Sequence, residues 1–256
     1  MQDWGNLLKK ELRLGLPAFW IVVGALLFIG GVASYIGGRN EVLNETLFIF
    51  SGVAFLLMSL YLSFYFIFSM TAETKRLHLW LHHKRSAVSL LLAKMTSGVI
   101  YQVIVMAFLV VIAFVTVTQV QWNAIPNGWN LAVSAAAFLS IHIVLYSIYT
   151  SMALLFFWMV FLLMKKVMPT IVSVCFTVII AIAALSAFGW LGGTAFYAAI
   201  SEWGSINMEN LFFWVNFSFL QIETPVIYIG SYVLDILLTV VLFILSAWIL
   251  DRKVEV

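Results

Sequence analysis

The sequence is poor in charge, and this shortage decides its class. Charged residues make up 9% of the chain, whereas hydrophobic residues make up 64%. A soluble globular domain carries about 25% charged and about 45–50% apolar residues. The chain therefore has more apolar surface than a water-soluble fold can bury, and its mean hydropathy of +1.09 agrees with a lipid bilayer as its solvent.

Cysteine and proline are also scarce. Cys175 is the single cysteine, which excludes an intramolecular disulfide. The four prolines are Pro17, Pro126, Pro169 and Pro225. Proline costs about 3 kcal/mol inside a helix and little in its first turn. We therefore expect the prolines to lie at or between the membrane spans.

Sequence motifs of soluble catalytic sites are missing. The chain has no GxxxxGK[ST], HExxH, GxSxG or CxxC. His78 and His82 have the i, i+4 spacing of a metal site, with Glu73 and His83 as further ligands. The Lys and Arg residues around them disfavour a cation, so we expect a basic helix without metal. The formal net charge of +2 gives no indication of nucleic-acid binding.

Long apolar runs predict six membrane-spanning helices, since about 20 apolar residues cross the hydrocarbon core. The predicted spans cover about residues 17–37, 47–70, 95–117, 138–164, 167–190 and 226–250. The first run exceeds the roughly 7–15 residues of a signal-peptide core, so we expect it to be retained. We therefore expect an all-α integral membrane protein with a single transmembrane domain over residues 1–256.

Two segments outside the spans have amphipathic or mixed character. Trp4, Leu8 and Leu12 recur every fourth residue within residues 3–16, which predicts a helix lying in the membrane interface; a plain charged tail is the alternative. Residues 191–225 combine three glutamates with many aromatic side chains. We interpret this segment as a pair of short re-entrant helices on the outer side.

The distribution of Lys and Arg predicts the orientation. Twelve of the thirteen lie in the N-terminal segment, the loop 71–94, Lys165–Lys166 and the C-terminus, while Arg39 alone lies on the other side. Basic residues concentrate in cytoplasmic loops. We therefore expect a multi-pass protein of the cell membrane with both termini in the cytoplasm.

The loop 71–94 combines an apolar edge with a charged rim. Leu77, Trp80 and Leu81 form the apolar edge, and the charged residues around it are Glu73, Lys84, Arg85 and Lys94. The charges alone are typical of a linker that fixes topology, which is the alternative interpretation. The apolar edge favours a docked partner protein.

The order of these residues resembles the permease subunits of ABC-2-type transporters. An acidic residue, an amphipathic helix, a basic pair and a lysine near the start of span three follow one another in Glu73, Leu77–Leu81, Lys84–Arg85 and Lys94. The segment Lys9–Arg13 is similar to the connecting helix of that family. The pattern departs from the family where His82 and His83 replace a proline before the basic pair.

The resemblance implies a permease that is not itself an enzyme and carries no cofactor. A separate ABC ATPase subunit would hold ATP and magnesium and dock on the loop as its coupling helix. A second permease copy or paralogue would complete a dimer in the lipid membrane. The apolar interior favours export of an amphipathic or hydrophobic substrate such as a peptide, an antibiotic or a lipid-like molecule.

Ionisable and amide side chains inside the predicted spans are candidates for the translocation path. They are Asp235, His142 and Gln102. The alternative role for each is a hydrogen bond between helices. Two other classes also stay open: an intramembrane enzyme using Asp235 with His142, and a non-transporting membrane sensor.

Overall fold

The computed structural model describes residues 2–74, 86–117, 128–207 and 226–251. The side chains of residues 2, 3, 73, 74, 117 and 128–135 lie outside that description. Six of the described helices are long and apolar enough to cross a membrane, which confirms the expected all-α multi-pass membrane protein. The chain divides into two compact units, Met1–Ser151 and Met152–Val256.

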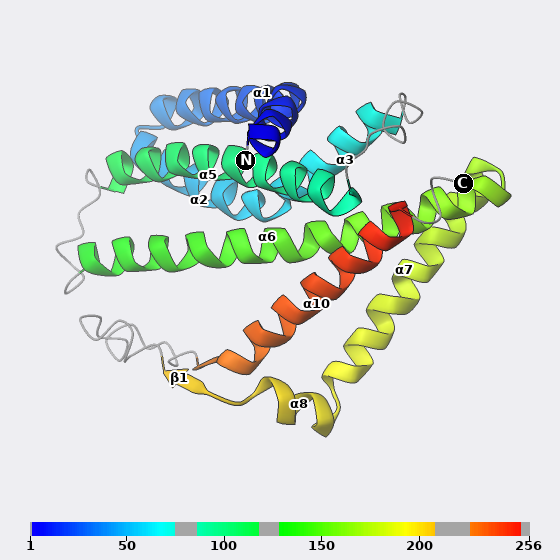
Figure 1. Ribbon diagram of the computed structural model, residues 1–256. Coiled ribbons are helices and arrows are strands. Elements are labelled where there is room, and N and C mark those ends of the chain that lie inside the picture. The colour runs from blue at the N-terminus through cyan, green and yellow to red at the C-terminus, as the bar shows by residue number, and fades with distance from the viewer. Residues whose placement is uncertain (1, 75–85, 118–127, 208–225, 252–256) are drawn as a thin grey trace. The chain divides into compact units, whose positions relative to one another are not determined.

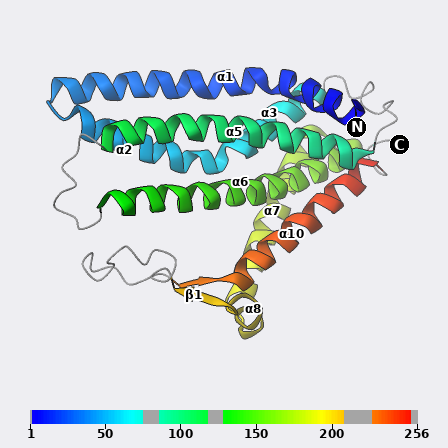
Figure 2. The same ribbon diagram turned by 60° about the vertical axis from the view of Figure 1, so that its left-hand side comes forward.

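The first unit is helical in its described part. Its elements are α1 (Gln2–Arg39), α2 (Leu43–Leu57), the 3₁₀ turn η1 (Met58–Leu60), α3 (Tyr61–Thr74), α5 (Ala87–Val117) and the first part of α6 (Gly128–Val167). Helices α1, α2 and α5 contact one another, as both views show (Figures 1 and 2). Helix α3 contacts both α1 and α5.

Helix α1 is continuous from Gln2 to Arg39 and contains Pro17 in its interior. The predicted interfacial helix and the first predicted span are therefore one helix. A proline removes a single backbone donor, and membrane helices tolerate this loss because neighbouring groups satisfy the freed carbonyl.

The buried face of the first turns of α1 differs from the predicted stripe. Trp4 is exposed, and Leu8 and Leu12 are only half-buried. The buried positions are Leu7, Glu11, Gly15 and Ala18. They recur with a helical period on a face next to the predicted stripe, because Leu7 and Glu11 each come one residue before Leu8 and Leu12. The packed face thus contains an acidic residue and a glycine, which an apolar search passes over.

Helix α5 begins at Ala87, eight residues before the predicted start of the third span. Leu90 donates its backbone N–H to the carbonyl of Ser86, which closes the first turn. The run from Ala87 to Ala93 is rich in alanine and leucine, which favour a helix. The connection between α3 and α5 therefore covers only residues 75–86 instead of 71–94.

Helix α6 extends over 40 residues, about 60 Å at 1.5 Å per residue. This length is about twice the thickness of a hydrocarbon core. Lys165 and Lys166 occupy its last turn, where their positive charges interact favourably with the negative end of the helix dipole. The predicted fourth span, 138–164, lies inside this longer helix.

The second unit contains the rest of the chain. Its described elements are the last part of α6, α7 (Thr170–Gly192), α8 (Ala195–Ser201), β1 (Ser205–Asn207), β2 (Val226–Tyr228) and α10 (Ile229–Ile249). Helix α8 contacts both α7 and α10, and Figure 2 shows it beside β1. The Thr194 hydroxyl caps α8 by accepting the N–H of Tyr197.

The segment predicted as re-entrant helices contains one short helix and a strand in its described part. Strands β1 and β2 pair antiparallel, with Ile206 opposite Ile227. Gly204 turns the chain into β1 with a φ of 68°, a conformation that glycine adopts without strain. The second predicted short helix would fall in residues 208–225, outside the described residues. The predicted start of span six at Val226 is strand, and the helix begins at Ile229.

Candidate functional site

A buried ion pair joins three helices of the first unit. The Lys94 ammonium on α5 lies 2.8 Å from the Glu11 carboxylate on α1. The same ammonium donates to the Ser69 hydroxyl on α3 at 2.5 Å. Lys94 is 0% exposed and Glu11 is 1% exposed. Because both charges are removed from solvent, each depends on the other for its stability.

A second chain of hydrogen bonds lies beside the ion pair. The Ser97 hydroxyl lies 2.8 Å from the backbone carbonyl of Lys94 and 2.6 Å from the Tyr65 hydroxyl, and the Tyr65 hydroxyl also lies 3.4 Å from the backbone carbonyl of Glu11. One residue further along α1, the carbonyl of Leu12 accepts the hydroxyl of Tyr101 at 2.6 Å. These bonds link α3, α5 and α1 at the same level as the ion pair.

Two glycines give the Tyr65 ring its space. A Cβ on Gly15 of α1 would lie 2.5 Å from Cε2 of Tyr65, and one on Gly98 of α5 would lie 2.8 Å from Cδ1 of the same ring. Both separations are too short for real atoms. The ring therefore fits only because neither neighbouring helix carries a side chain there.

An apolar contact and the buried polar groups lie close to the α3–α5 connection. Leu7 of α1 packs with Leu90 and Ala93 of α5. Ser69 precedes the end of α3 by five residues, and Lys94 follows the start of α5 by seven residues. At 1.5 Å per residue these positions are about 8 Å and about 10 Å from the connection.

The residues predicted to contact an ATPase divide into two groups. Leu77, Trp80, Leu81, Lys84 and Arg85 lie outside the described residues, and so does the side chain of Glu73, whose backbone belongs to α3. Lys94 is described, and its charged group points into the helix packing toward Glu11. A side chain at 0% exposure makes no surface contact. If Lys94 has a role in partner binding, it acts through the helices that it joins.

The three candidates for the translocation path lie in different settings. Gln102 is fully buried and donates from Nε2 to the Met58 carbonyl in η1 at 2.9 Å, whereas its Oε1 has no hydrogen-bond partner among the described residues. His142 is half-buried and bonds the Phe138 carbonyl of its own helix at 2.8 Å. Asp235 is exposed on α10. The structure thus places Gln102 in helix packing and keeps Asp235 on a helix surface.

The bond from Gln102 lies where the helix changes its pitch. Met58 begins the 3₁₀ turn η1 between α2 and α3, within the span Leu43–Ala72. A short 3₁₀ stretch inside a long helix often marks a hinge. The amide of Gln102 supports one carbonyl of this turn from the neighbouring helix.

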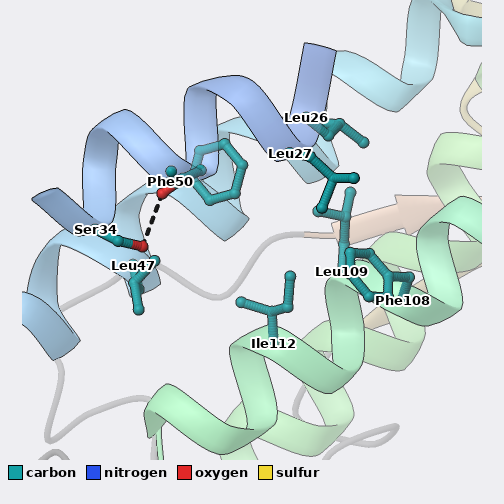
Figure 3. A pocket seen from close by; sticks show the side chains of 10 residues that line it. Leu26, Leu27, Ser34, Leu47, Phe50, Phe108, Leu109 and Ile112 are labelled. Carbon is teal, nitrogen blue, oxygen red and sulfur yellow. Dashed lines mark hydrogen bonds between the residues drawn. The ribbon is translucent and has the colours of Figure 1, made fainter. Parts of the chain in front are cut away.

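An apolar cavity of about 310 Å³ opens between α1, α2 and α5 (Figure 3). Leu27, Phe50 and Leu109 are among its lining residues. The one hydroxyl in the lining, that of Ser34, donates to the Gly30 carbonyl of its own helix at 2.8 Å, as the dashed line shows. The cavity therefore offers a hydrocarbon surface and no charged group.

Sequence reasoning did not identify Glu11 as a site residue. The spacing of Glu11 indicates its burial. Glu11 lies four residues after Leu7 and four before Gly15, on the face of α1 that packs against the neighbouring helices. An acidic residue on the packed face of a membrane helix requires a cation. Within the described helices of this unit, Lys94 supplies that cation.

Comparisons with known proteins give no assignment. No protein-family model matches the chain, and no curated protein or solved structure is significantly similar to it.

Proposed function

We propose that the chain is the membrane-spanning permease subunit of an ABC-2-type exporter. On this proposal a separate ATPase subunit binds ATP and magnesium and docks on the α3–α5 connection from the cytoplasm. Leu77, Trp80 and Leu81 would supply the apolar contact, and Glu73, Lys84 and Arg85 the charged rim. Rim charges favour orientation and rate of association more than affinity.

The observation that carries the proposal is the buried cluster of Glu11, Lys94 and Ser69. It lies near the ends of α3 and α5 that border the connection 75–86; we call these two helices the α3–α5 hairpin. Lys94 and Ser69 each lie within about two helical turns of the connection, and Glu11 links them to α1. A partner that moves the connection would therefore move α1 as well. A loop that only fixes the membrane topology does not need a buried connection to α1, because the positive-inside effect depends on charge alone.

The mechanism is a shift between two arrangements of the helices. ATP would draw the two ATPase subunits together, and the hairpin would follow them. A ligand shifts such an equilibrium only through contacts that differ between its states. A second copy of the chain, or a paralogue, would form the other wall of the path.

The cargo proposed is amphipathic or hydrophobic. The cavity between α1, α2 and α5 has a hydrocarbon lining, which fits an apolar chain and offers nothing to a small hydrophilic ion. Asp235, exposed on an apolar helix, would give the path one negative charge. Export is the expected direction.

Reconstitution tests the proposal. The tagged chain is purified from its native membranes with any bound ATPase subunit and placed in lipid vesicles. ATP hydrolysis is then measured with panels of amphipathic peptides and of lipids. Stimulation by members of either panel supports the proposal, whereas a chain that purifies without any ATP-hydrolysing subunit contradicts it.

A further inference from the structure

The Glu11–Lys94 ion pair connects α1 and α5 beside a small apolar contact. The apolar contact beside it consists of Leu7, Leu90 and Ala93. Apolar contacts have no preferred direction and tolerate sliding. The ion pair is directional, and its two charged atoms lie 2.8 Å apart.

Desolvation makes the pair costly to separate. At exposures of 0% and 1%, water cannot replace either partner when the helices slide. A shift of α1 along α5 by one turn, about 5.4 Å, would leave both charges buried and unpaired. The position of α1 along α5 is therefore set by charge as well as by shape.

Ser69 extends the link to the third helix. Its hydroxyl accepts from the same ammonium that binds Glu11, so one cation contacts α1 and α3 from its place on α5. Helices α3 and α5 are the two arms that carry the connection 75–86. Glu11 thus couples α1 to both α3 and α5 through the Lys94 ammonium.

We propose that Glu11 and Lys94 are positioning residues that make α1 follow the α3–α5 hairpin. A load on the connection reaches the first membrane-spanning helix through this ion pair. The role in transport rests on the proposed function, but the positioning of α1 can be measured on the chain alone.

The test uses spin labels on exposed positions of the two helices. Leu14 on α1 and Val88 on α5 are exposed and are changed to cysteine, with the exposed Cys175 changed to serine. The distance distribution between the labels is measured by pulsed electron resonance in lipid nanodiscs. It is compared between the parent and the neutral double variant Glu11→Gln/Lys94→Met.

The parent is expected to give one narrow distance peak. The neutral variant is expected to keep its helix content and lose this single peak, because packing without charge permits sliding. The matched control is Tyr101→Phe, which removes an uncharged bond between the same two helices and should keep the peak. A neutral variant with the parent's peak overturns the proposal, because packing alone would then position α1.

A milder variant covers the case in which the neutral double variant does not fold. Ser69→Ala removes the link from Lys94 to α3 and leaves the ion pair. With labels on Leu14 and the exposed position Ala72 of α3, this variant should broaden the α1–α3 distance. An unchanged α1–α3 distance contradicts the proposed link through Ser69.

The final comparison adds the ATPase subunit that purifies with the chain. Vanadate trapping with ATP should shift the Leu14–Val88 distance in the parent. The neutral variant should lose this shift while it retains the ATPase. A retained shift overturns the role of the ion pair in transmission. If no ATPase purifies with the chain, the proposed function fails, and the label distances of the chain alone still decide whether the ion pair positions α1.

Discussion

Removing one partner of the Glu11–Lys94 pair should destabilise the protein more than removing both. Lys94→Met leaves a carboxylate at 1% exposure, and Glu11→Gln leaves an ammonium at 0% exposure. Leaving one buried charge unpaired costs about 3–5 kcal/mol. Each single variant should therefore lower the folding equilibrium constant by about two to four orders of magnitude, since about 1.4 kcal/mol is a factor of ten.

The double variant Glu11→Gln/Lys94→Met leaves no unpaired charge. Ser69 loses a donor, but a serine hydroxyl in a helix can bond a carbonyl of the preceding turn. Buried pairs replaced by groups of similar volume are often neutral in stability. The side chain introduced by Glu11→Gln is still polar, so we expect the double variant to lose about 1–3 kcal/mol, less than either single variant, with a favourable coupling energy in the double-mutant cycle.

Equilibrium unfolding in mixed micelles of a mild detergent and dodecyl sulfate measures these values by circular dichroism. Lys9→Met is the control, because Lys9 is exposed on the same helix and its loss should leave the midpoint unchanged. Single variants that unfold with the parent's midpoint would refute the reasoning, because the two charges would then be solvated rather than buried and paired.

Three further predictions concern single residues. Gly98→Ala forces a methyl group into the ring of Tyr65 and should destabilise the unit by about 1–3 kcal/mol in the same unfolding assay; Gly24→Ala, with no atom within 4 Å of the added carbon, is its control and should not destabilise. Tyr101→Phe removes a second donor from the Leu12 carbonyl, which lies inside α1 and keeps its helical donor, and should cost about 0.5–1.5 kcal/mol; a loss as large as that of the ion-pair variants would contradict its neutral character. Asp235→Asn should leave the unfolding midpoint unchanged and lower the peptide-stimulated ATPase activity of the reconstituted complex; a lower midpoint with normal activity would assign Asp235 a structural role instead.

The sequence predicts the membrane helices well because each rests on a strong local signal. A run of about 20 mostly apolar residues is long enough to cross a bilayer, and the six helices agree in number with the six runs. Helix ends were less predictable. Ala87–Ala93 was assigned to the loop because of the basic residues before it, although its own residues favour a helix.

The ribbon of β1 and β2 was not predictable from local sequence. Its two strands of three residues are separated by residues 208–225, and strand pairing at that separation leaves no periodic pattern. The pairing depends on contacts between distant residues, which a reading along the chain does not capture.

Of the three residues in the candidate site, the sequence analysis identifies Lys94 but neither Glu11 nor Ser69. Lys94 is identified from its place before the third span, as a residue of the coupling segment. Glu11 was treated as part of a charged segment, because Lys9, Lys10 and Arg13 surround it. The pairing follows from the packing of α1 against α5, which brings together residues 83 positions apart.

Association with an ATPase subunit tests the central claim most directly. The tagged chain, the variant Leu81→Asp and the control Val42→Asp are expressed in the native membrane and purified. Val42 is an exposed apolar residue before α2, on the side predicted to face away from the cytoplasm. The parent and the control should retain an ATP-hydrolysing subunit, and Leu81→Asp should insert in the membrane and lose it. Recovery of that subunit with Leu81→Asp at the parent's ratio would contradict the proposed docking site.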